Sequence, residues 1–154
     1  MRPELYVGVV GVVGVVAVLG AAAAVAVPEA EEWYDGRHEQ TSSYATGKEA
    51  KEERESVPRW LPDDAASVEY AMRTTGGERI LKATLHDGRL PAQCEALGGR
   101  SAPDPEISAA WFPSGAADSA KGRCGSYYVA LKDHTLYAWQ TNDDWVAENR
   151  DSAQ

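Results

Sequence analysis

The sequence predicts a protein of the α+β class, with an N-terminal transmembrane helix followed by a small antiparallel β-sheet domain that has little helix. Two observations lead to this prediction. Residues 5–27 form one unbroken apolar run, and beyond residue 57 apolar and polar residues alternate between turns rich in glycine and proline. A chain of 154 residues has room for one domain of ordinary size.

The apolar run contains 23 residues without a charge, of which 19 are hydrophobic and 4 are glycine. A helix of this length reaches about 34 Å, enough to cross a hydrocarbon core of about 30 Å. Valine and glycine form helices poorly in water, but lipid offers the backbone no other hydrogen-bond partners. We therefore expect a single transmembrane helix over residues 5–27.

The charges that flank the run predict its direction. Arg2 is the one side-chain cation before it, whereas four acidic residues follow within residues 29–35. Lysine and arginine favour the cytoplasmic end, so the N-terminus is expected inside and the rest of the chain outside the membrane. The alternative is a cleaved signal peptide, because residues 24–26 read Ala-Val-Ala. The length of the run favours a retained anchor.

Glycines recur at every third position of the run, at Gly8, Gly11 and Gly14. They spread over about 120° of one helix face, and small residues allow membrane helices to approach closely. The pattern indicates a helix-packing surface for a dimer or a membrane partner. A short vocabulary of valine, alanine and glycine also produces such spacings by chance.

Residues 28–56 carry nine acidic and four basic side chains and few large aliphatics. Such a segment buries too little apolar area to offset chain entropy, so we expect an acidic tether, with a solvated helix over residues 48–55. The whole chain has a net charge of −9. Because nucleic-acid binding needs a basic face, this charge argues against a nucleic-acid partner.

The extracytoplasmic domain is expected over residues 57–148. Residues 68–72 and 79–85 alternate around a glycine turn, and 127–131 and 135–141 flank a second turn, so two hairpins are predicted. Residues 107–112 are apolar on both faces, as in a central strand. One short helix is expected within 90–97, Asp63 and Asp64 are expected to cap a brief helical turn, and the polar end after residue 141 is expected to fray.

Cys94 and Cys124 are the two cysteines of the chain. A domain of about 90 residues buries a limited core, and cysteines placed outside the membrane usually pair. We therefore expect a Cys94–Cys124 disulfide, which closes a loop of about 30 residues and is worth about 3 to 4 kcal/mol in the loop-entropy model. Free buried thiols and a metal site are the alternatives.

No motif of the sequence is specific for catalysis, a cofactor or a metal. His86 and His134 stand in turn sequences beside Asp87 and Asp133, and together they could form an acid–base or metal site. Solvated turn histidines explain the same pattern. Neither a nucleophile elbow nor a phosphate loop occurs, so the protein is predicted to be non-catalytic and to carry no cofactor.

Aromatic residues are enriched in the outer domain. Tyr128, Tyr137 and Trp139 would share a face on adjacent strands and could form a platform for a sugar, a peptide or a partner protein. A small domain also needs large side chains to fill its core, so a packing role is the alternative.

The outer domain resembles small single-pass membrane proteins of actinobacteria, a group without an activity that can be carried over. The residues that carry the resemblance are 57–65 (VPRWLPDDA), 73–76 (RTTG), 90–94 (LPAQC), 111–113 (WFP), Cys124 and 136–139 (LYAW). The resemblance implies a membrane-anchored module that faces the cell surface in a high-GC Gram-positive bacterium.

These observations lead to three hypotheses about function. The first is a membrane-anchored extracytoplasmic interaction or accessory protein of the cell envelope, without catalysis. The second is an envelope hydrolase or transferase that uses His86 or His134 with nearby carboxylates. The third is an accessory subunit that docks into a larger membrane complex through its glycine-rich helix.

Overall fold

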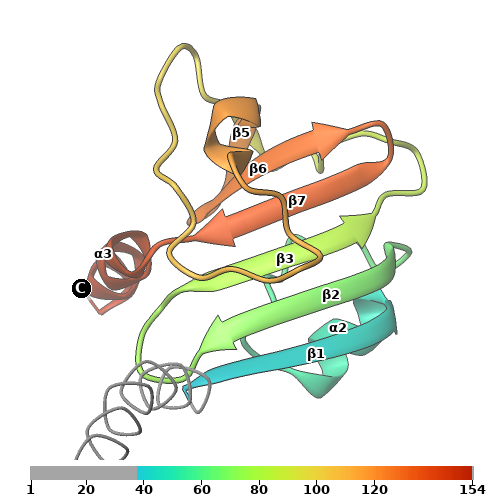
Figure 1. The fold of residues 1–154 in the computed structure, drawn as a ribbon, viewed down its shortest axis with the longest axis horizontal. Coiled ribbons are helices and arrows are strands. Elements are labelled where there is room, and N and C mark those ends of the chain that lie inside the picture. The colour runs from blue at the N-terminus through green and yellow to red at the C-terminus, as the bar shows by residue number, and fades with distance from the viewer. Residues whose placement is uncertain (1–37, 154) are drawn as a thin grey trace, which may run out of the picture. The chain divides into compact units, whose positions relative to one another are not determined.

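The computed structural model describes residues 38–153, which fold around one seven-stranded antiparallel sheet with the strand order β1-β2-β3-β7-β6-β5-β4 (Figure 1). The strands are β1 (Glu39–Thr46), β2 (Ala66–Arg73), β3 (Arg79–Thr84), β4 (Glu95–Ala96), β5 (Gly122–Cys124), β6 (Tyr127–Lys132) and β7 (Thr135–Gln140). The helices are α2 (Gly47–Glu53), the short 3-10 helix η1 (Ala116–Ser119) and α3 (Asn142–Ser152). The structure thus shows the small antiparallel β-sheet domain with little helix that the sequence predicts.

The expected transmembrane helix over residues 5–27 lies outside the described residues, as do Gly8, Gly11 and Gly14. Within residues 38–153, none of the helices combines the length and the apolar character needed to cross a bilayer.

The domain begins at Glu39, earlier than the sequence predicts. Part of the expected tether is instead strand β1, which pairs with β2 from Glu39↔Arg73 to Thr46↔Ala66, and helix α2, which confirms the helix expected there. Thr46 caps α2 by accepting a hydrogen bond from the backbone of Glu49, whose carboxylate accepts one from the backbone of Ala45. This tract was mistaken for a tether because its buried positions are few: Tyr44, Gly47 and Ala50.

Both predicted hairpins are confirmed. β2 pairs with β3, and β6 pairs with β7. β3 also pairs with β7, from Arg79↔Gln140 to Thr84↔Thr135, so the two hairpins join into one continuous sheet. The period-two pattern predicts these strands correctly because each buries alternate side chains on opposite faces.

One face of the sheet, here called the helix face, is covered by α2 and residues 54–65. Its core consists of alternate strand residues such as Val68, Leu81 and Leu136, packed against Val57 and Leu61 of the covering segment. These five side chains are at most 1% exposed. The helix face therefore holds the larger and more aliphatic part of the core.

The other face, here called the loop face, is covered by residues 97–121, drawn yellow to orange where they cross in front of the sheet in Figure 1. Residues 107–112 were expected to form a central strand, and this expectation is wrong. They form turns and irregular structure, and Ile107 and Phe112 are buried against the sheet beneath them. A loop that covers a sheet can bury apolar side chains without pairing its backbone with a strand. Composition alone does not distinguish such a loop from a central strand.

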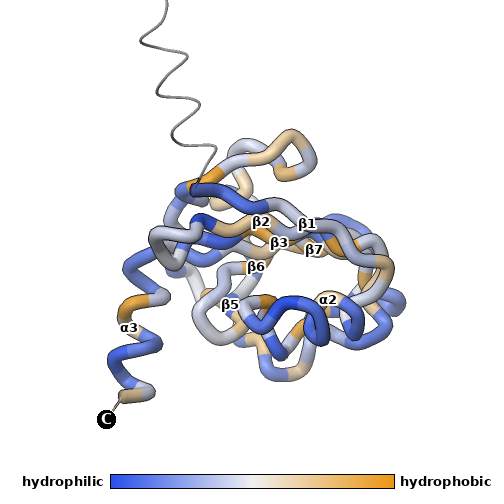
Figure 2. The backbone as a smooth tube through the Cα atoms, turned by 90° about the horizontal axis from the view of Figure 1, so that it is seen from below, coloured by the Kyte–Doolittle hydropathy of each residue, from blue (hydrophilic) through white to orange (hydrophobic). Residues whose placement is uncertain are grey.

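Three smaller expectations also fail. Residues 90–97 contain turns and strand β4 in place of a helix. Asp63 and Asp64 lie in a turn without a helix, where Asp63 pairs with Lys51 at 2.6 Å. The C-terminal segment forms α3, a largely polar helix that extends away from the sheet (Figure 2), where fraying was expected.

Candidate functional site

The main candidate site is a pocket of about 380 Å³ on the helix face, at the end of the sheet where α3 begins. We call it the Arg79 pocket. Residues 55–60 form one wall, Arg79 and Gln140 form the floor together with residues 125–127, and α3 contributes Trp145, Glu148 and Asn149. Segments far apart in the sequence therefore meet around one concavity.

Arg79 and Gln140 are direct neighbours across the β3–β7 pairing. Both point to the helix face, in line with the apolar side chains of their strands, and they are 7% and 4% exposed. The Gln140 amide donates to the carbonyl of Gly77 at 2.6 Å and accepts from the hydroxyl of Ser126. The floor of the pocket is thus a fixed polar layer at the edge of an aliphatic core.

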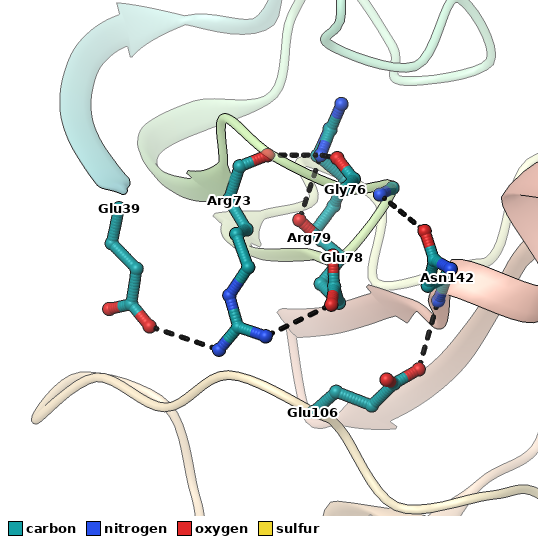
Figure 3. A network of polar contacts seen from close by, with 8 residues as sticks. Glu39, Arg73, Gly76, Glu78, Arg79, Glu106 and Asn142 are labelled. Atoms are coloured by element: carbon teal, nitrogen blue, oxygen red, sulfur yellow. Dashed lines mark hydrogen bonds and ion pairs between the residues drawn. The ribbon is translucent and has the colours of Figure 1, made fainter. Parts of the chain in front are cut away.

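Within the described part of the chain, the guanidinium of Arg79 donates hydrogen bonds from one of its three nitrogens only. Its Nη1 donates to the carbonyls of Arg73, Gly76 and Glu78, at 3.2, 2.9 and 2.9 Å. Its Nε and Nη2 make no hydrogen bond to any residue that the structure describes, and one nitrogen points away from these carbonyls in Figure 3. Within residues 38–153 no carboxylate forms an ion pair with Arg79.

The other arginine of this turn is neutralised. Arg73 lies between Glu39 and Glu78, at 3.6 and 3.0 Å, on the opposite face of the sheet (Figure 3). Asn142 joins the same network by accepting from the backbone of Gly77, while its own backbone donates to Glu106. The ion pairs therefore hold the β2–β3 turn from one face and leave the Arg79 charge facing the pocket.

Two buried tyrosines belong to the surroundings of the pocket: Tyr127 lines it, and Tyr70 contacts the lining residue Ser56. Burial raises the pKa of Tyr127 well above its ordinary value, and burial also raises the pKa of Tyr70. The Tyr70 hydroxyl lies 3.0 Å from the hydroxyl and 3.2 Å from the carbonyl of Ser56. Neither phenol can serve as a base near neutral pH, and the pocket lining holds neither histidine nor cysteine.

Trp60, another lining residue of the pocket, carries a second unused donor. Its ring meets Tyr127 edge-on, with centroids 5.7 Å apart, and its Nε1 is buried without a hydrogen-bond partner among the described residues. A Cβ built on Gly125 would lie 4.0 Å from both Trp60 and the Glu148 carboxylate. Buried donors nearly always have partners, so this one calls for an explanation.

The charges at the mouth of the pocket are mixed. Glu55 and Glu148 are exposed there. Arg59 donates to the carbonyls of Lys51, Arg54 and Glu55 at 2.8 to 3.2 Å, so its guanidinium is engaged in holding the wall. The deepest charge, on Arg79, is therefore positive and the exposed rim carries two carboxylates.

The predicted aromatic platform of Tyr128, Tyr137 and Trp139 lies on the loop face, as the alternation requires. Trp139 is 0% exposed, its Nε1 donates to the carbonyl of Pro103 at 2.9 Å, and Phe112 packs edge-on against it at 6.2 Å. The expectation of an open aromatic surface is therefore corrected for Trp139, which is a core residue. Tyr128 and Tyr137 remain half-buried at the border of this cluster.

Neither His86 nor His134 forms an ion pair with a carboxylate within residues 38–153. His134 Nδ1 lies 3.0 Å from the carbonyl of Leu85, and His86 lines a separate pocket of about 390 Å³ together with Asp64 and Asp87. Asp87 accepts a hydrogen bond from the backbone of Arg89, and Asp133 occupies a left-handed turn position with φ of 55°. Among residues 38–153 no group of three or more histidine, cysteine or acidic side chains is placed to hold a metal ion.

The predicted Cys94–Cys124 disulfide is present. Cys124 is fully buried in β5, and Cys94 precedes β4, so the bond ties together the two ends of the segment that covers the loop face. With both cysteines in the bond, the alternative of free thiols or a metal site does not describe this structure.

Sequence reasoning missed the Arg79 pocket, although one signal was available. In β3 the apolar alternation runs through Leu81 and Ala83, and Arg79 continues the same register on the buried side. A charged residue at a core-facing position is the feature to look for.

Comparison of the chain with protein-family models, curated proteins and solved structures finds no match.

Proposed function

We propose that this protein is a membrane-anchored extracytoplasmic module of the cell envelope that binds a ligand or partner without catalysing a reaction. The observation that carries the proposal is the Arg79 pocket, a concavity with unused donors on Arg79 and Trp60. Catalysis would need a nucleophile hydrogen-bonded to a base. The Ser126 hydroxyl in the lining instead donates to the Gln140 amide, and the unused donors suit recognition of a ligand.

The compartment is inferred from the disulfide and the apolar run. Disulfides persist in oxidising compartments and are rare in the cytosol. The Cys94–Cys124 bond joins two residues 30 positions apart in a small domain. The apolar run of residues 5–27 would supply the anchor. Together they favour a domain held outside the membrane.

The enzyme hypothesis would rest on the pocket that His86 shares with Asp64 and Asp87. Among the described residues no ion pair joins His86 or His134 to a carboxylate, so the positioned acid–base pair that catalysis needs is not formed there. The docking role of Gly8, Gly11 and Gly14 stays a prediction.

Protease treatment of intact spheroplasts tests the topology. The full chain carries a C-terminal tag, and we expect external proteinase K to remove the tag while a cytoplasmic marker survives. Alkylation of the extracted protein without reduction should leave both cysteines unmodified. A protected tag, or two alkylated thiols, would overturn the proposed compartment.

A matched pair of variants tests the anchor. Replacing Val15 and Val16 with arginine costs about 2.5 to 3.5 kcal/mol for each residue at the centre of a membrane helix, so the protein should leave the membrane fraction after carbonate extraction. Replacing the same residues with leucine should leave it in that fraction. Equal partitioning of the two variants would contradict the predicted span.

A further inference from the structure

We propose that the Arg79 pocket binds a small organic monocarboxylate, with the free edge of the Arg79 guanidinium as the anchor for the carboxylate group. This inference rests on the proposed binding function and adds the chemical class of the ligand. It is carried by three features of the pocket: an unneutralised buried cation, a second unused donor, and aromatic walls.

The first feature is the charge. Arg79 is 7% exposed and has no carboxylate partner among residues 38–153. A buried charge is stable only when it is paired or fully hydrogen-bonded. The three carbonyls on Nη1 stabilise one side of the guanidinium, so an anion on the other side would complete its coordination.

The second feature is the geometry of the free donors. Because Nη1 is occupied, the donors left over are Nε and Nη2, which lie on one edge of the planar guanidinium. Such an edge offers two parallel N–H groups, the arrangement that binds both oxygens of a carboxylate. Arg79 is one of the lining residues of the pocket, and Nη1 is held by backbone carbonyls, so we infer that the Nε and Nη2 edge is the part that a ligand would meet.

The third feature is the surroundings of the anchor. Trp60, Tyr127 and Trp145 line the same pocket, and large aromatic side chains favour an apolar body on the ligand. The Nε1 of Trp60 is buried without a hydrogen-bond partner among the described residues, so a ligand that reaches it would gain a neutral donor. A volume of about 380 Å³ suits a molecule of modest size.

The rim selects against a second negative charge. Glu55 and Glu148 are exposed at the mouth, and like charges repel a dianion more strongly than a monoanion. We therefore assign the pocket to a monocarboxylate in preference to inorganic phosphate.

Titration of the full chain in detergent micelles with phenylacetate tests the assignment, using isothermal calorimetry and the fluorescence of the pocket tryptophans. Phenylacetate should bind saturably with a Kd of about 1 mM or tighter. Benzyl alcohol, which lacks the carboxylate, and inorganic phosphate should bind at least tenfold more weakly. Binding of benzyl alcohol or phosphate as tight as that of phenylacetate would overturn the assignment, as would no phenylacetate binding.

Two variants locate the binding site. Arg79→Lys keeps a cation that can reach the backbone carbonyls but removes the two-donor edge, so phenylacetate affinity should fall at least tenfold. Trp60→Phe keeps a ring and removes the unused donor, and affinity should fall about threefold. The control Arg89→Lys, an exposed residue beyond the far end of β3, should bind phenylacetate like the unchanged protein.

The thermal midpoint of each variant is recorded first. If Arg79→Lys is unfolded, the phenylacetate affinity of Trp60→Phe tests whether the ligand binds in the Arg79 pocket. Unchanged affinity in the folded variants would overturn the assignment. Spheroplast proteolysis separates the two proposals: an exposed, folded domain that ignores phenylacetate contradicts the ligand class alone, whereas a protease-protected domain contradicts the proposed function.

Discussion

The two faces of the sheet are covered in different ways. The helix face is closed by α2 and residues 54–65, which lie between β1 and β2 in the chain, and its core is mainly aliphatic. The loop face is closed by residues 97–121, which contain one short 3-10 helix, and its contacts are mainly aromatic, centred on Phe112 and Trp139.

The difference shows that the two faces of one small sheet can be buried by different kinds of cover, one that includes a helix and one that is almost entirely loop. The helix face is held by many interdigitating side chains, which act together when the domain folds. The loop face depends on a few large rings and on the bond that fixes the ends of its cover. We expect the first face to set global stability and the second to open locally.

The largest effect is expected on the helix face. Leu81→Ala removes a fully buried side chain and should lower the free energy of unfolding by about 2 to 5 kcal/mol, measured by urea titration. The control Lys82→Ala, the next residue on the opposite face, should change it by about 0.5 kcal/mol or less. Equal effects of the two variants would break the distinction between the faces.

Removal of the disulfide should come next. Replacing Cys94 and Cys124 with serine opens the 30-residue loop and should lower the free energy of unfolding by about 3 to 4 kcal/mol in the loop-entropy model. The unchanged protein under reducing conditions serves as the comparison and should lose a similar amount. If urea titration shows no loss, the loop cover is held by its side chains alone.

A smaller loss is expected for Phe112→Ala, although a larger side chain is removed. The ring contacts Tyr137 and Trp139 from the cover, and local opening limits the global cost to about 1 to 2 kcal/mol. Trypsin should cleave after the exposed Arg100 faster than in the unchanged protein, as followed by mass spectrometry. The exposed Ser114→Ala serves as control. A loss as large as that of Leu81→Ala would show that the loop and sheet unfold together.

The smallest expected effect is on the pH dependence of the thermal midpoint and involves an ion pair on the helix face. The hydrogen bond and the charge of Lys51 lower the pKa of Asp63. A carboxyl whose pKa is lower in the folded state stabilises the protein above its unfolded pKa, and this contribution is lost as the pH falls through the folded pKa. The thermal midpoint should therefore fall less steeply between about pH 5 and pH 2 in Asp63→Asn. Asp64→Asn, which removes a charge from the adjacent residue, should follow the unchanged protein.

The central strands could be predicted because both of their faces are buried and their side chains alternate. β1 could not, since Tyr44 is its one buried side chain and the rest of the strand is mostly polar. The same holds for α3, which has no buried residue and no apolar stripe. An element at the margin of a domain is stabilised by pairing and caps, and these leave little trace in hydropathy.

The candidate site could not be predicted from the sequence for another reason. Arg79 and Gln140 are 61 positions apart and become neighbours only through the β3–β7 register. Trp60 and Glu148 reach the same pocket from a loop and a helix whose placement no local pattern reveals. The disulfide, in contrast, could be predicted because a chain with two cysteines leaves a single intramolecular pairing.

The two outer strands of the sheet differ in how much backbone they leave open. β4 pairs with β5 over two residues, and β1 pairs with β2 from Glu39 to Thr46, through seven of its eight residues. Among the described residues β1 has no neighbour on its outer side, so it exposes a longer row of amide and carbonyl groups to another chain. Strand addition by a second molecule would therefore find more open backbone groups at β1 than at β4, and the serine- and threonine-rich sequence of β1 presents mostly polar side chains along that edge.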